Sequence, residues 1–175
     1  MPVYLGDLMK TLTMILASVL VLLSTVTALS APVQANGRFP TQPDGILTPG
    51  ELCSHPDARR YPERIAYCNR DVASDLKKDI IDTYDKARGF QIGDMPRAQF
   101  KIDHYIPLCA GGSNDRDNLW PQHESVYTIT DPLEALICQK MSEGKLKQVD
   151  AVATIKKGKA NLDQVPEIIS QLNKL

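Results

Sequence analysis

The chain has 175 residues, with 43% hydrophobic residues, 23% charged residues and a formal net charge of −1. This length is enough for one domain, and the composition is typical of an ordinary globular protein. The near-neutral charge argues against tight, stoichiometric binding of nucleic acid. It leaves room for an enzyme that holds phosphates briefly with a few basic side chains and a metal ion.

The first 35 residues predict a secretory signal peptide. Lys10 precedes an uncharged, apolar run over residues 11–29, and small residues follow, among them Ser30 and Ala35. We expect cleavage after Ala35, with Ser30 as the other option, and therefore a secreted or periplasmic protein with no stable membrane partner. The alternative is an uncleaved anchor, because the run approaches the ~20 residues that span a bilayer.

All four cysteines follow that segment, and an even number of cysteines in an exported chain predicts two disulfides. Three pairings are open. We favour Cys53–Cys68, which closes a short local loop, and Cys109–Cys138, which ties a turn to a following helix. A structural zinc site is the alternative, but the chain lacks the C-x-x-C spacing of such sites.

Before the central motif, the sequence predicts little regular structure apart from one helix. Residues 36–50 are rich in Gly, Pro, Thr and Asp, and we expect a flexible or loosely packed lead-in. Residues 51–72 are irregular and bounded by cysteines. A helix is expected from Ser74, which can cap it, to a stop at Gly89. The arginines of the irregular segment, which either face phosphate or form a solvated surface, are Arg59, Arg60, Arg64 and Arg70.

A strand is expected over residues 99–108, followed by a glycine-rich turn at 111–115 and a second strand over 118–122. A helix over 123–143 comes next, and Pro132 either kinks or restarts it. On the first strand, Phe100, Ile102, His104 and Ile106 would share one face. Two amphipathic helices are expected next. The apolar residues of the first are Leu146, Val149, Val152 and Ile155. The second starts near Pro166, and its apolar residues are Ile168, Ile169 and Leu172.

Asp103 and His104 form an acid–histidine pair at the end of the first strand. Phosphodiester hydrolysis needs a base for water, a cation for the phosphoryl oxygens and stabilisation of the leaving oxygen. A neutral His suits the first task, and a carboxylate with another N or O ligand suits the second. Because neighbouring side chains of a strand point to opposite faces, a twist or bulge must bring the pair together.

Further polar residues follow at spacings that suit the same site. Asn118 can orient His104 or pin the turn through backbone hydrogen bonds. His123 is our candidate for the second metal ligand, with Glu124 and Glu134 as fallbacks. The basic residues that flank the site and are candidates for holding substrate phosphates are Lys101, Arg116 and Arg97.

Residues 100–123 also carry a recognisable pattern, made of Asp103-His104, Pro107, Gly111-Gly112, Asn114-Asp115, Asn118-Leu119 and Trp120-Pro121. It resembles the first two-thirds of the signature of HNH (ββα-metal, His-Me finger) endonucleases, and especially of exported bacterial members. The resemblance implies that His104 activates water, Asp103 binds the metal and Asn118 supports the site. A residue of the following helix would complete the metal's coordination. Where many members place the last His or Asn, this chain has Tyr127, a poor metal ligand.

We therefore expect an α+β fold: a ββα-metal (HNH) hairpin–helix core at about residues 99–143, inside a disulfide-stabilised nuclease domain of residues 51–175 with additional packed helices. The expected function is a monomeric exported endonuclease that cuts DNA, and optionally RNA, with little sequence specificity. It would use one divalent ion, Mg²⁺ first, with Mn²⁺, Zn²⁺ or Ni²⁺ if a histidine ligates it. The alternatives are an inactive, disulfide-stapled binding protein on the same core, and a zinc-stabilised Cys/His module.

Overall fold

The computed structural model describes residues 37–175, so the expected signal peptide lies outside the described residues. The described chain has an α+β fold with two small antiparallel hairpins, β1 (Ala58–Arg60) with β2 (Ile65–Tyr67), and β3 (Phe100–His104) with β4 (Leu119–His123). No helix between residues 37 and 175 is long and apolar enough to cross a membrane. The helices are α1 (Ser74–Arg88), α2 (Glu124–Ser142), α3 (Gln148–Ala160) and α4 (Val165–Leu172).

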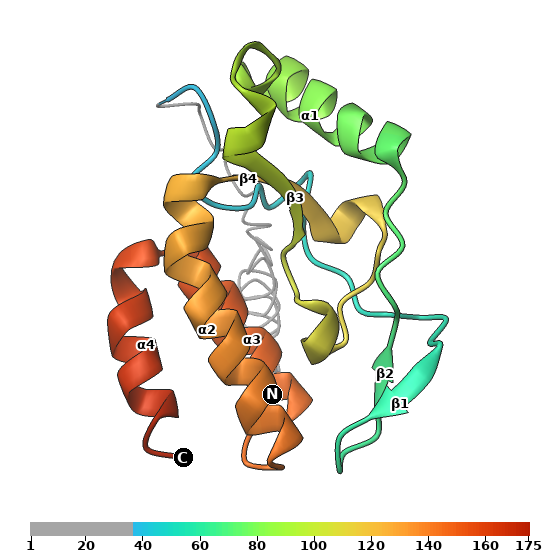
Figure 1. Cartoon of the computed structure of the whole chain (residues 1–175), viewed down its shortest axis with the longest axis vertical. Helices are drawn as coiled ribbons and strands as arrows, with labels where there is room; N and C mark the ends of the chain where they lie inside the picture. Colours follow the sequence, from blue (N-terminus) through green and yellow to red (C-terminus); the bar gives the residue numbers. More distant parts are fainter. Residues whose placement is uncertain (1–36) are drawn as a thin grey trace, which may run out of the picture.

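The β3–β4 hairpin lies between two hydrophobic clusters. Helices α2, α3 and α4 pack together on one side, and α1 covers the other side against β4 (Figure 1). Trp120 is completely buried beneath α1, so it anchors the core. The cluster of the three C-terminal helices is built around Leu133, Ile137, Ala151, Ile155 and Ile168.

Helix α1 agrees with the sequence prediction except at its first residue. It ends before Gly89, whose φ of 74° is a left-handed conformation that glycine adopts without strain. At the other end, Ala73 is the N-cap residue, and Ser74 already belongs to the helix. No side chain caps this helix.

The central hairpin and the helices after it differ from expectation in three places. Strand β3 ends at His104 instead of Leu108, because the chain turns through Pro107 into a 3-10 turn. Helix α2 runs through Pro132 as one helix. Val149 of α3 is 70% exposed, because the buried face of α3 is formed by Ala151, Ile155, Gly158 and Lys159.

Both expected disulfides are present. Cys53–Cys68 ties the segment before β1 to the end of β2, and Cys109–Cys138 ties the turn after β3 to α2. No cysteine of the described chain is free, which rules out the zinc module built on cysteine ligands.

The segment before β1 packs closely, in contrast to the loosely packed lead-in that we expected at residues 36–50. Asp44 is buried and pairs with Arg88 of α1 at 2.6 Å. Thr48 Oγ1 donates a hydrogen bond to the carbonyl oxygen of Leu119 at 2.9 Å. These polar side chains find partners on α1 and β4. The Gly- and Pro-rich segment before β1 is therefore ordered and packed against the rest of the fold.

Candidate functional site

Asp103 and His104 are both buried at the end of β3, with 8% and 2% of their surfaces exposed. The pairing of β3 with β4 is regular from Phe100 opposite His123 to His104 opposite Leu119. No bulge interrupts this register, so neighbouring side chains point to opposite faces of the hairpin. Of the twist or bulge expected at the strand end, the bulge is therefore wrong, and the acid and the base lie in two separate environments.

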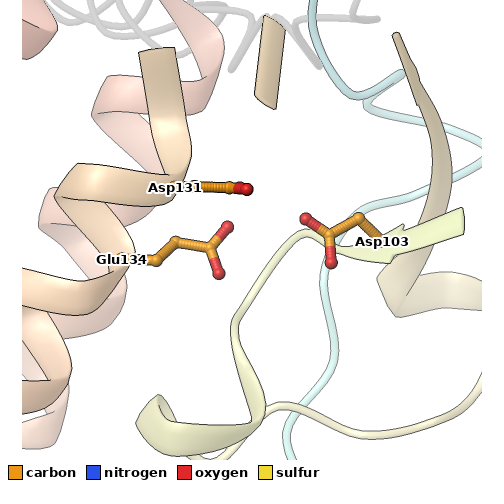
Figure 2. Close-up of side chains that lie close together, drawn as sticks. All are labelled: Asp103, Asp131 and Glu134. Carbon is orange, nitrogen blue, oxygen red and sulfur yellow. The ribbon is translucent and has the colours of Figure 1, made fainter. Parts of the chain in front are cut away.

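On one face, Asp103 meets Asp131 and Glu134 of α2. One oxygen from each carboxylate lies within 4.8 Å of the others. Figure 2 shows the two helix carboxylates pointing across to the strand carboxylate. Asp131 and Glu134 share a face of α2 because residues three apart are neighbours on a helix.

Two lysines pair with this acidic cluster. Lys101 Nζ lies 2.7 Å from Asp131 Oδ1 and 3.4 Å from Asp103 Oδ2. Lys159 Nζ lies 2.5 Å from Glu134 Oε1 and 3.7 Å from Asp103 Oδ2. Lys101 is about one-third exposed, whereas Lys159 is completely buried. With all groups ionised, three carboxylates and two ammonium groups leave one net negative charge.

Burial and charge act in opposite directions on these carboxylates. Burial alone raises the pKa of Asp103, but the ammonium groups of Lys159 and Lys101 outweigh it and hold that pKa below its usual range. For Glu134 burial dominates and raises the pKa, although Lys159 opposes it. Of these two carboxylates, Asp103 is the one that stays ionised more readily.

The donor set fits a hard divalent cation. All three candidate ligands are carboxylates, the ligand type that Mg²⁺ prefers. Asp103 Oδ2 and Glu134 Oε1 are buried and accept no hydrogen bond. Such oxygens are costly to bury unless a cation is close, and here the lysines supply that charge.

Close packing of two helices brings Lys159 to the cluster. A Cβ atom at Gly158 would collide with Leu133 Cδ2, so a larger residue would force the Leu133 side chain to move out of this close contact between α3 and α2. Lys159 Nζ then donates a hydrogen bond to the backbone oxygen of His104 at 2.5 Å.

On the other face, polar contacts hold the His104 ring in one tautomer. Arg70 Nη1 lies 3.2 Å from Nδ1, and Asn114 Oδ1 lies 3.1 Å from Nε2. Because a guanidinium group only donates, Nδ1 is the acceptor and Nε2 carries the proton. Burial, aided by the charge of Arg70, lowers the pKa of His104 to about 4 despite the bond to Asn114. The imidazole is neutral at pH 7, with its lone pair facing Arg70.

Asn118 pins the turn and makes no contact with the His104 ring among its hydrogen bonds. Its Oδ1 accepts from the Ile106 N–H at 2.8 Å, and its Nδ2 donates to the carbonyl oxygens of Ile106 and Ser113, each at 2.9 Å. Gly112 is required here because a Cβ would collide with the Ile106 oxygen. Of the two roles that we considered for Asn118, the structure shows the structural one.

His123 lies away from the acidic cluster. Its Nδ1 caps α2 by accepting from the Ser125 N–H at 3.2 Å, and its ring stacks on Phe39 with centroids 3.9 Å apart. In the hairpin it stands opposite Phe100, whereas Asp103 stands opposite Trp120. The structure therefore does not bring this predicted ligand to the predicted metal.

Only some of the fallback ligands and flanking basic residues reach the acidic cluster. Glu134 belongs to the acidic cluster, and Glu124 does not. Of the basic candidates, only Lys101 reaches Asp103. Arg116 pairs with Asp79 of α1. Arg97 donates to the Phe100 oxygen and lines a pocket of about 440 Å³ beside α1.

Sequence reasoning missed Asp131, Lys159, Asn114 and the contact of Arg70 with His104. The i, i+3 spacing of Asp131 and Glu134 on the expected helix was a usable signal. Lys159 had no such signal, because its contact with His104 spans 55 positions of the chain.

No family model, curated protein or solved structure matches this chain. A function must therefore be argued from the site itself.

Proposed function

We propose that the protein is an exported, metal-dependent endonuclease of the HNH type that cleaves DNA, with RNA as an optional second substrate. One observation carries the proposal: at the end of one strand, a buried neutral histidine directly follows an aspartate that belongs to a carboxylate cluster on the opposite face. The order of β3, β4 and α2 matches the hairpin–helix core that the sequence resemblance implies. The two disulfides support export, since such bonds persist in oxidising compartments.

His104 is the general base in this proposal. Its lone pair is on Nδ1, which accepts from Arg70, and that atom would take a proton from the attacking water once Arg70 has moved. Arg70 lies beside the same atom and presents a planar fork that suits phosphate oxygens. On substrate binding, the guanidinium would shift from Nδ1 to the phosphate and leave room for the water.

In an in-line displacement the attacking and leaving oxygens lie on opposite sides of phosphorus. Asp103, Asp131 and Glu134 would hold the divalent ion. When bound there, the ion would screen the phosphoryl oxygens and the leaving oxygen. Oxygen-only ligands favour Mg²⁺, with Mn²⁺ second, over Zn²⁺ or Ni²⁺.

The test is digestion of plasmid DNA and of RNA by the purified, disulfide-bonded protein, with EDTA, Mg²⁺, Mn²⁺ and Zn²⁺ in turn. We expect cutting with Mg²⁺ or Mn²⁺ that His104→Ala abolishes. His55→Ala is the matched control, because His55 is exposed and bonds only to Ser54. A folded wild type that cuts nothing with any metal contradicts the proposal.

A second candidate function is a binding protein on an inactive core. It is favoured by one observation, the pairing of both Lys101 and Lys159 with the carboxylates that a metal would need. Metal titration in the absence of substrate separates the two functions. A protein that binds no divalent ion would favour the binding protein.

A further inference from the structure

The β1–β2 hairpin presents three exposed arginines, Arg59, Arg60 and Arg64. We call residues 58–67 the arginine hairpin. None of its arginines forms an ion pair with a carboxylate in the described part of the chain. Three cations without a carboxylate partner thus lie on one short segment of a protein whose net charge is −1. The positive charge of this surface is therefore local.

The acidic residues nearest in sequence are engaged with backbone groups. Asp57 Oδ2 accepts from the Asn69 N–H at 2.7 Å, and Glu63 Oε2 accepts from the Gln148 N–H at 2.7 Å. These hydrogen bonds fold the segment and fasten it to α3. They also draw the carboxylates away from the arginines, so the guanidinium groups stay available to a ligand.

The arginine hairpin is held in place before any ligand binds. Cys68, directly after β2, is bonded to Cys53, and Ile65 is 4% exposed in the cluster of the C-terminal helices. Arg60 lies over the Tyr67 ring, 3.3 Å from its centroid. Binding therefore costs little backbone conformational entropy.

The same chain segment continues into the candidate site. Asn69 accepts a hydrogen bond from Asn114, and Arg70 contacts His104. The hairpin lies at the edge of the molecule, on the side of β3 away from α2 (Figure 1). From Ile65 to Arg70 an extended chain spans roughly 16 Å, the length of roughly five base pairs.

We propose that the arginine hairpin is a backbone-binding arm that contacts phosphates of a polymeric nucleic acid about five nucleotides from the cleavage site. Arginine suits this ligand because its fork binds phosphate oxygens in pairs. The inference rests on the proposed nuclease function and specifies its substrate as a polymer rather than a dinucleotide. The contacts read no sequence, because phosphates carry none.

The test compares Arg59→Gln/Arg64→Gln with Lys157→Gln/Lys174→Gln. The control pair removes the same charge from exposed lysines of α3 and the C-terminus. Arg60 is left intact because it also packs on Tyr67. Binding of a labelled duplex of about 20 base pairs is measured by fluorescence anisotropy in EDTA at several salt concentrations. A plot of the logarithm of the association constant against the logarithm of the salt concentration has a negative slope. Each phosphate contact that is lost should make that slope less steep by about 0.9.

We expect the slope for the arginine variant to be less steep than that of wild type by nearly two, and the slope for the control variant to be unchanged. With metal, its kcat/KM should fall about tenfold on the duplex and stay unchanged on a dinucleotide. The proposed arm is contradicted if both variants have the same slope, or if the arginine variant loses the same fraction of kcat/KM on the duplex and on the dinucleotide.

The outcomes also separate the arm from the nuclease. If duplex binding depends on the arginine hairpin but the wild type cleaves nothing, the phosphate-binding role of the hairpin is supported and the nuclease function is contradicted. If the wild type cleaves and the two variants bind and cleave the duplex equally well, only the proposal for the arginine hairpin is contradicted. A wild type that binds no duplex at low salt overturns both.

Discussion

Lys159 Nζ donates a hydrogen bond to the backbone oxygen of His104 at 2.5 Å, across 55 positions of the chain. The same ammonium group lies 2.5 Å from Glu134. One completely buried cation thus joins α3, α2 and the end of β3. It supports both halves of the site, the strand that carries the base and the carboxylates that would carry the metal.

Lys159→Met should destabilise the protein strongly, because it leaves Glu134 and the His104 oxygen buried without their partner. Removal of one member of a buried ion pair costs about 3–5 kcal/mol. Urea unfolding at pH 7 measures this loss. Lys157→Met, on an exposed position of the same helix, should stay within about 0.5 kcal/mol of wild type. A Lys159→Met midpoint equal to wild type would show that the pair carries no net stability.

Lys101→Gln should tighten binding of a divalent ion. Its ammonium group competes for Asp131 at 2.7 Å and Asp103 at 3.4 Å, and it is exposed enough to leave. Loss of one positive charge this near should lower the Kd for Mn²⁺ by about tenfold after screening by solvent. Isothermal titration calorimetry measures it without substrate. Lys157→Gln is the control, and weaker binding by Lys101→Gln would refute the competition.

Glu134→Gln and His123→Asn together decide the second metal ligand. Glu134 lies in the acidic cluster, so Glu134→Gln should weaken Mn²⁺ binding by about tenfold or more. His123 caps α2, and Asn can take over that cap, so His123→Asn should leave the Kd unchanged. The opposite pattern would restore His123 as the ligand.

The stability of the metal-free protein should depend on pH through His104. Its pKa is about 4 in the folded protein against an ordinary 6.5. Between these values the unfolded chain binds the extra proton, so stability should fall as the pH drops from 6.5 to 4. The loss approaches about 3 kcal/mol below pH 4. Urea unfolding in EDTA at several pH values should show this component in wild type and not in His104→Gln. Identical profiles would contradict the depressed pKa.

Asn118→Ala should behave as a folding variant. It leaves polar groups of Ile106 and Ser113 buried without partners, at about 1–3 kcal/mol for each. We expect a fall in stability of roughly 3 kcal/mol or more by urea unfolding. Loss of cleavage at unchanged stability would instead place Asn118 in the chemistry.

Features set by nearby residues were predictable. The helix that ends at Gly89, the strands on either side of the glycine turn, and the helix after His123 follow from local periodicity and turn residues. The lead-in was misjudged because composition says nothing of partners, and Asp44 and Thr48 find theirs on α1 and β4.

By itself, the sequence determined the main helices, the β3–β4 hairpin, the presence of two disulfides and the placement of Asp103 and His104 at a strand end. It did not predict the β1–β2 hairpin, which lies in the segment expected to be irregular. Only the tertiary structure decided which groups surround Asp103 and His104. The docking of α2 and α3, through Gly158, brings Glu134 and Lys159 to one face. Such contacts depend on how helices pack, and packing joins residues whose separation along the chain leaves no periodic signal.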